Sequence, residues 1–201
     1  LGAQKAFYIA ADMANEADPD KVVDYALENP FSMWKGMWIT PNETMLIHEC
    51  FFVKVNFFSY IQMAWKALPS LEQNKGSLVV VSSLLGKITS PFVAPYSSTK
   101  FALNGFFGSL RHELAMKKSN VSISVCTLGL IDTDSAMEKV RGVTDVPAYP
   151  ATDAALNIII TGSTRQPELF YPWFTYFIVI TKDWFPSLTD YMTQNSYNYI
   201  P

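Results

Sequence analysis

The sequence predicts an α/β protein built on a doubly wound, mainly parallel sheet. Short apolar runs with the character of strands alternate along the 201 residues with longer helical patterns. The run SLVVVSS at 77–83 is rich in β-branched residues and apolar on both faces, as expected for a strand that helices cover on both sides. A hydrophobic fraction of 49% and a charged fraction of 16% are enough for one domain with a buried core.

The N-terminal elements begin with a strand and a helix. The apolar run at 5–12 ends in Asp12 and indicates a strand. The segment 18–29 carries acidic residues in its first turn and Pro19 at the first helical position, which is typical of a helix start. The following stretch, 30–48, breaks the strand–helix rhythm, although a short strand around 36–40 fits there.

The remaining elements continue the alternation of helices and strands. A helix is expected over 56–73, closed by NKG, and Gly162 is expected to stop the last helix of the series. The other expected elements are a strand at 77–83, a long helix at 96–118, a strand at 120–130 and a helix at 152–162.

Charge and cysteine usage exclude several classes of partner. The net charge is −3 and the basic residues are scattered, so no nucleic-acid surface is expected. The two cysteines lie in unrelated contexts and the two histidines lie far from each other in the sequence, so neither a disulfide framework nor a metal site is expected. The first residues lack the basic and apolar segments of a signal peptide and have the character of the middle of a domain.

The segment YSSTK at 96–100 carries the strongest chemical signal. A spacing of four places Tyr96 and Lys100 on one face of a helix. An ammonium beside a phenol favours the phenolate and lowers the phenol pKa from about 10, which brings proton exchange closer to neutral pH. Ser83 ends the strand 77–83, at the strand end where such sheets bind ligands, and could bind a substrate oxygen against Tyr96.

A Tyr-x-x-x-Lys pair also occurs by chance, with the tyrosine packed and the lysine stem lying along an apolar surface. Three features of the context favour the acid/base hypothesis: the buried strand ending in two serines, the interval of thirteen positions from Ser83 to Tyr96, and Asn56 at the start of the preceding helix. Ser82 is interpreted as structural, because the interval to Tyr96 selects Ser83.

Three segments resemble the short-chain dehydrogenase/reductase family. Residues 79–114, VVVSSLLGKITSPFVAPYSSTKFALNGFFGSLRHEL, resemble its active-site strand and helix, and VNFFSY at 55–60 resembles the segment with its catalytic asparagine. LGLIDTDSAM at 128–137 resembles the loop after the sixth strand, in a Leu-Gly version similar to the hydroxysteroid dehydrogenase branch. The resemblance covers 1–165 apart from 30–48, and continues weakly to SYN at 196–198.

This resemblance implies a Rossmann-like fold and an NADP(H)-dependent oxidoreductase that interconverts hydroxyl and ketone on a small, apolar, steroid-like substrate. Tyr96 would be the general acid/base, Lys100 would lower its pKa and hold the nicotinamide ribose, and Ser83 would orient the substrate oxygen. Asn56 would anchor a water in a proton relay. Steroid-handling relatives often carry tyrosine where this chain has Ser90, so an altered substrate pocket is expected.

The resemblance also implies cofactor contacts, to the adenine and to the nicotinamide carboxamide. These positions are Asp12, Met13, Ile131 and Thr133. Alternatives remain open for several residues: Asn56 fits equally well as a helix cap, Asp12 as a turn residue at a strand end, and Thr133 as the start of a short helix.

One departure from the family pattern is large. None of the nine glycines belongs to a glycine-rich turn that could cradle a dinucleotide. The expected fold therefore lacks the first βαβ unit, and the chain is interpreted as a partial domain at 1–165 followed by a tail at 166–201. The alternative function is a non-catalytic remnant that dimerises or binds lipid, and the chain alone is expected to be inactive.

The tail is aromatic, and Pro172 interrupts a run too short to span a bilayer. Residues 169–185 fit a peripheral membrane contact, and equally a homodimer or core contact. A sequon at Asn120 lies in an expected surface turn and resembles a glycosylation position in relatives of the endoplasmic reticulum. The luminal side of the endoplasmic reticulum is therefore the expected location, with secretion as the alternative.

Overall fold

The computed structural model describes residues 12, 15, 17–28 and 52–198. The chain forms two compact units, Leu1–Asn74 and Lys75–Pro201, which are described separately below. The strands predicted at 5–12 and 36–40 lie outside the described residues, apart from Asp12.

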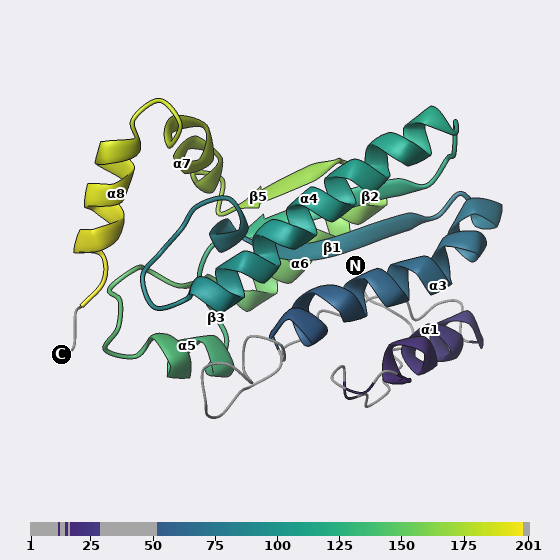
Figure 1. The fold of residues 1–201 in the computed structure, drawn as a ribbon, viewed down its shortest axis with the longest axis horizontal. Coiled ribbons are helices and arrows are strands. Elements are labelled where there is room, and N and C mark those ends of the chain that lie inside the picture. Colours follow the sequence, from purple (N-terminus) through teal and green to yellow (C-terminus); the bar gives the residue numbers. More distant parts are fainter. Residues whose placement is uncertain (1–11, 13–14, 16, 29–51, 199–201) are drawn as a thin grey trace. The chain divides into compact units, whose positions relative to one another are not determined.

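The described part of the first unit is helical: α1 (Asp18–Glu28), the π-helical segment η1 (Lys54–Phe58) and α3 (Ser59–Asn74) (Figure 1). The Asp18 carboxylate accepts the backbone N–H of Asp12 at 2.9 Å and the Lys21 ammonium at 2.7 Å. An acidic group at a helix start meets the positive end of the helix dipole, which explains why α1 begins here.

A parallel sheet forms the centre of the second unit. It contains β1 (Ser77–Ser83), β2 (Ser122–Leu128) and β5 (Glu168–Tyr171) in the order β1-β2-β5. The register pairs Ser77 with Ser122 and Val125 with Glu168. A separate parallel pair joins β3 (Ile131–Asp132) to β4 (Tyr149–Pro150).

Helices cover the sheet of the second unit. Figure 1 shows α4 (Ala94–Met116) crossing in front of the strands and α6 (Ala151–Ser163) behind them. The other helices are η2 (Leu84–Gly86), α5 (Asp134–Val140), α7 (Thr175–Thr181) and α8 (Pro186–Asn195). None of the helices in the described ranges is long and apolar enough to cross a bilayer.

The core of this unit lies on both faces of β2. Cys126, Leu128, Ile131 and Ala154 form one buried cluster between the sheet and α6. Ile123 and Val125, on the alternate face of β2, are also buried. Helices on both faces explain why β1 and β2 carry apolar residues on both of their faces.

Two sequence predictions need correction here. β5 lies in the segment 166–201 that was interpreted as a separate tail, yet it pairs with β2. The boundary at residue 165 is therefore wrong for residues 168–171, which belong to the sheet. Gly162 does not stop the helix, because α6 continues to Ser163 and Thr164 follows as its C-cap.

Candidate active site

The turn after β1 and the start of α4 bring three predicted site residues together. β1 ends at Ser83, whose side chain lies close enough to the Tyr96 phenol to lower the pKa of that phenol. The Lys100 Nζ lies 5.6 Å from the centre of the Tyr96 ring and donates to the Val81 carbonyl oxygen at 3.2 Å. Serine, phenol and ammonium therefore share one site at the carboxyl end of β1, as the spacing of four on a helix predicted.

The ionisation of this site differs from the sequence prediction. Burial raises the pKa of the Tyr96 phenol, and the hydrogen bond from Ser83 opposes this rise only in part. Burial also lowers the pKa of the Lys100 ammonium, to about 8. The predicted lowering of the phenol pKa is wrong for the chain as it stands, because desolvation of the charged form outweighs the opposing effect of Ser83. Tyr96 therefore carries its proton at neutral pH.

Ser83 is held in one orientation. Its backbone is extended, with φ −142° and ψ 158°, and its Oγ accepts the backbone N–H of Leu85 at 3.1 Å. This bond caps the short helix η2. Since the Oγ already accepts from Leu85, its own proton is available to donate toward the phenol oxygen of Tyr96.

Two of the predicted cofactor contacts lie beyond the end of β2. Ile131 is buried within the core cluster, and the Thr133 side chain accepts the backbone N–H of Ala136 at 3.3 Å as the N-cap of α5. The alternative that Thr133 begins a short helix is therefore confirmed, and its contact with a carboxamide stays a prediction. Ser90 is half-buried in the segment between η2 and α4.

The remaining predicted site residues belong to the first unit. Asn56 lies inside η1, not at its start, so the helix-cap alternative for Asn56 is wrong. Short π-helical segments occur often at functional sites, which is compatible with the predicted role of Asn56. Asp12 is exposed, and Met13 lies outside the described residues.

Sequence reasoning missed Asn104, which lies one helical turn after Lys100. Its side-chain amide donates to the carbonyl oxygens of Gly86 and Lys100 and to the Ser82 hydroxyl. A spacing of i, i+4, i+8 from Tyr96 is the only signal in the sequence for Asn104, and by itself it names no partner. Ser82 is buried and bonded to Asn104, in line with its interpretation as structural.

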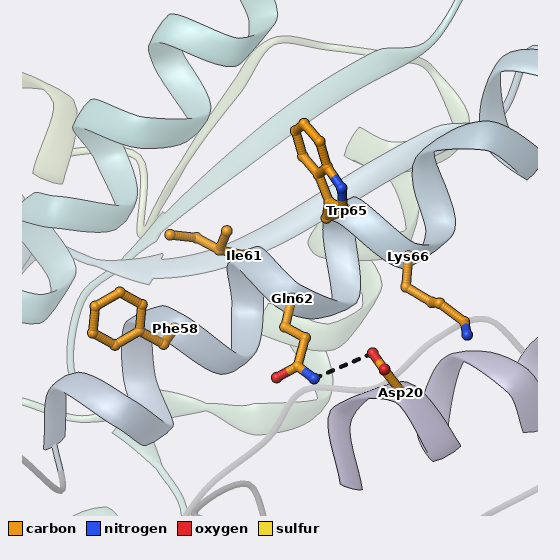
Figure 2. A pocket seen from close by; sticks show the side chains of 6 residues that line it. All are labelled: Asp20, Phe58, Ile61, Gln62, Trp65 and Lys66. Carbon is orange, nitrogen blue, oxygen red and sulfur yellow. Dashed lines mark hydrogen bonds between the residues drawn. The ribbon is translucent and has the colours of Figure 1, made fainter. Parts of the chain in front are cut away.

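Figure 2 shows a pocket within the first unit, lined by residues of α1, η1 and α3. Its volume is about 450 Å³. Its lining is largely apolar, and the Gln62 amide donates to the Asp20 carboxylate across it at 3.3 Å. None of the predicted site residues lines this pocket. Among the described residues, no group of three or more His, Cys, Asp or Glu side chains could hold a metal ion.

The fold and the site define an α/β protein with a serine, a tyrosine and a lysine at the carboxyl end of a parallel strand. A family profile described as short chain dehydrogenase matches residues 41–144. The Hydroxysteroid 11-beta-dehydrogenase 1-like protein of Danio rerio is 56% identical over 216 residues, which cover 100% of this chain and 72% of that protein. The protein of the same name from Xenopus tropicalis is 44% identical, over 99% of this chain and 72% of its own length. The chain belongs to the short-chain dehydrogenase family.

Solved structures show the same fold. A short chain dehydrogenase from Burkholderia cenocepacia J2315, crystallised in complex with NADP, has a TM-score of 0.72 and 18% identity, over 92% of this chain and 77% of that one. A short-chain dehydrogenase from Streptomyces avermitilis has a TM-score of 0.68 and 17% identity, over 95% of this chain and 79% of that one. These similarities confirm the Rossmann-like α/β fold with its parallel sheet.

Proposed function

We propose that this chain carries the catalytic site of an NADP(H)-dependent oxidoreductase that interconverts hydroxyl and ketone on an apolar, steroid-like substrate. The observation that carries the proposal is the arrangement of Ser83, Tyr96 and Lys100, in which the serine side chain lies beside the phenol and the ammonium lies over the phenol ring. The substrate class follows from the relatives, whose names refer to a hydroxysteroid dehydrogenase.

The residues around Tyr96 and Lys100 fit the nicotinamide half of a dinucleotide cofactor. The Lys100 ammonium and the Tyr96 hydroxyl are neighbouring polar groups in a partly buried setting, which suits the hydroxyls of the nicotinamide ribose. Ile131 and Thr133 follow β2 and would meet the carboxamide, and Asp12 would lie against the adenine. When bound, the cofactor supplies or accepts the hydride.

The side chains of the site transfer the proton that accompanies the hydride. In the direction of reduction, Tyr96 donates its phenolic proton to the substrate oxygen, for which its raised pKa keeps the proton in place at neutral pH. Ser83 orients that oxygen, and the Lys100 cation stabilises the phenolate that forms. Asn56 is proposed to anchor the water that returns a proton to the site.

The test compares Tyr96→Phe with Tyr191→Phe, a control on the exposed face of α8. It uses a fused form, in which the chain is joined to the part of the Danio rerio relative that it does not span. Turnover of the apolar ketone 2-decalone with NADPH is expected to fall by about 10²–10⁴-fold in Tyr96→Phe, as for loss of a general acid, with cofactor affinity almost unchanged. Full turnover in Tyr96→Phe would contradict the acid/base assignment.

A second function is favoured by the spacing of the glycines in the sequence, which does not match a phosphate-cradling turn. On this proposal the 201 residues alone bind NADP(H) very weakly, are inactive, and act as a dimerising or lipid-binding remnant. Calorimetric titration of the chain with NADPH, beside the fused form, distinguishes the two functions. Micromolar binding by the chain alone would contradict the remnant.

The partners that we propose for the chain are inferred from the residues exposed on its surface. Large apolar side chains are exposed on and around α7, and they support a homodimer or a peripheral membrane contact through 169–185. These side chains are Trp173, Tyr176, Phe177, Ile180, Trp184 and Phe185. Light scattering tests the dimer, and flotation with phosphatidylcholine vesicles tests the membrane contact.

An exposed Asn120 between α4 and β2 supports glycosylation in the lumen of the endoplasmic reticulum or during secretion. Expression in animal cells with a secretory leader should give a glycosidase-sensitive band that Asn120→Gln removes. An unmodified wild-type chain would contradict this location.

A further inference from the structure

The residues before and after Ser83 in the sequence both make polar contacts with α4. Before it, the buried Ser82 hydroxyl lies 3.5 Å from the Lys100 carbonyl oxygen and accepts from the Asn104 amide at 3.2 Å. After it, the Ser97 hydroxyl donates to the Leu85 carbonyl oxygen at 2.5 Å. The turn that presents Ser83 is therefore attached to the helix that presents Tyr96 and Lys100.

The Asn104 amide makes two bonds across this junction, to Ser82 and Gly86, and one within α4, to Lys100. Its Nδ2 lies 2.9 Å from the Gly86 carbonyl oxygen and 3.0 Å from the Lys100 carbonyl oxygen. An amide nitrogen has two protons, so the Gly86, Lys100 and Ser82 oxygens share them. The Asn104 amide thus joins the end of η2 to the backbone of the residue that supplies the ammonium.

Gly86 allows this close approach. A Cβ at position 86 would lie 2.4 Å from the Asn104 Nδ2 and 2.7 Å from the Lys100 carbonyl oxygen, distances that side chains do not tolerate. The absence of a side chain at Gly86 lets the turn meet α4 backbone to backbone. The contact between Gly86 and α4 therefore depends on the residue type at position 86 and does not involve a flexible side chain at the surface.

We propose that Asn104 is a positioning residue, which holds the Ser83 turn against α4 and thereby fixes the distance between the Ser83 hydroxyl and the Tyr96 phenol. This inference rests on the proposed function of the Ser83, Tyr96 and Lys100 site. Asn104 itself touches none of the reacting groups. It acts through Ser82 and Gly86, the residues on either side of the turn.

Loss of the Asn104 amide would leave the turn attached through fewer bonds. The Ser97–Leu85 bond and the bond from the Lys100 ammonium to Val81 would remain. Proton transfer depends steeply on the placement of donor and acceptor, and a displacement of about 1 Å at a site can cost about 10²-fold in rate. A turn that moves relative to α4 should therefore lower the rate of the chemical step more than the binding of cofactor.

The first part of the test is kinetic. Asn104→Leu keeps the approximate volume and removes both donors, and Asn104→Ala removes the side chain. Leu103→Val is the matched control, because Leu103 is fully buried on the same helix and its shortening weakens packing without touching the turn. With NADPH and 2-decalone, kcat of the fused form is expected to fall at least tenfold in both Asn104 variants, with KM for NADPH within twofold of wild type. Leu103→Val should keep kcat within twofold.

The second part measures hydrogen exchange of backbone amides in the 201-residue chain. The amides of Leu85, Lys87 and Ile88, which are bonded within the turn, should exchange at least tenfold faster in Asn104→Leu, while those of β2 should not change. Unchanged exchange in the turn, or a faster turn with wild-type kcat, would overturn the positioning role. A wild-type fused form that turns over no ketone would instead contradict the proposed function, and the positioning role would fall with it.

Discussion

Two regions of the second unit are held by different kinds of contact. One is the turn and helix at residues 82–104, and the other is the segment that contains α7 and α8. In the first region, small side chains let two backbone segments meet, and side-chain donors reach the carbonyl oxygens of Leu85, Gly86 and Lys100. In the second region, the contacts are between rings, such as Trp173 with Phe177 at 5.7 Å, and many of the same rings are exposed.

The difference separates two ways in which a sequence encodes function. Bonds to specific backbone atoms require one residue type at one position, so a short motif such as YSSTK is recognisable. An apolar surface requires only a composition, since rings and aliphatic groups can replace one another at little cost. Substitutions should therefore have large, position-specific effects in the first region and small, collective effects in the second.

The largest effect is expected from Lys100→Met. Because the folded chain releases the Lys100 proton near pH 8 and the unfolded chain near 10.5, the unfolded state binds more protons between these values. Lys100 should therefore raise the free energy of unfolding with pH in this window, by roughly 2–3 kcal/mol. The thiol of Cys126, whose pKa burial raises to about 12, opposes part of this rise above about pH 9. Denaturant unfolding at pH 7.5, 8.5 and 9.5 should show this rise in wild type and lose it in Lys100→Met. Lys117→Met, on an exposed control residue, should keep it.

The next effect is expected from Gly86→Ala. The added methyl group would meet Asn104 and the Lys100 backbone, and such overpacking costs about 1–3 kcal/mol of unfolding free energy. Gly105 and Gly108 lie in the same helix as Asn104, and among the described residues no atom comes within 4 Å of a Cβ added at either position. Gly105→Ala should stabilise the chain by up to about 1 kcal/mol, because alanine favours a helix. Equal unfolding midpoints for the two variants would remove the distinction between these glycines.

The smallest effect on stability is expected on α7 and α8. Trp184→Ser, Phe185→Ser and Leu188→Ser change exposed side chains, so each should alter the unfolding free energy by less than about 0.5 kcal/mol. The triple variant should nevertheless lose self-association or vesicle binding, measured by light scattering and flotation. Removal of the whole segment from residue 169 is a poorer test, because it would also delete most of β5. A triple variant that keeps both properties would show that this surface has another role.

Much of the fold was predictable because its signals are local. β1 was predicted to the residue, since β-branched side chains on both faces favour a covered strand. β5 was missed because its four residues carry no alternation that separates them from the aromatic segment that follows. Parallel pairing with β2, a tertiary interaction, gives these residues their strand conformation.

The candidate site was predictable where helical spacing sets it and unpredictable where packing does. Tyr96 and Lys100 share a face because four residues make one helical turn. The predicted direction of the Tyr96 pKa shift was wrong because burial, which the sequence does not show, raises the pKa. Asn104 was missed because its partners are mainly backbone carbonyl oxygens, and only the folded turn brings the Gly86 oxygen to it.

The parallel sheet also sets the order in which the second unit can form. Ser77 pairs with Ser122 and Val125 with Glu168, so more than forty residues separate the partners in each case. No hairpin can start this sheet, and each pairing must first close a long loop. The helix α4, whose contacts are local, can form within microseconds, whereas sheets with distant pairings commonly take milliseconds to seconds. During that interval β1 and β2 present apolar edges to other chains, so the yield of refolding should fall as protein concentration rises.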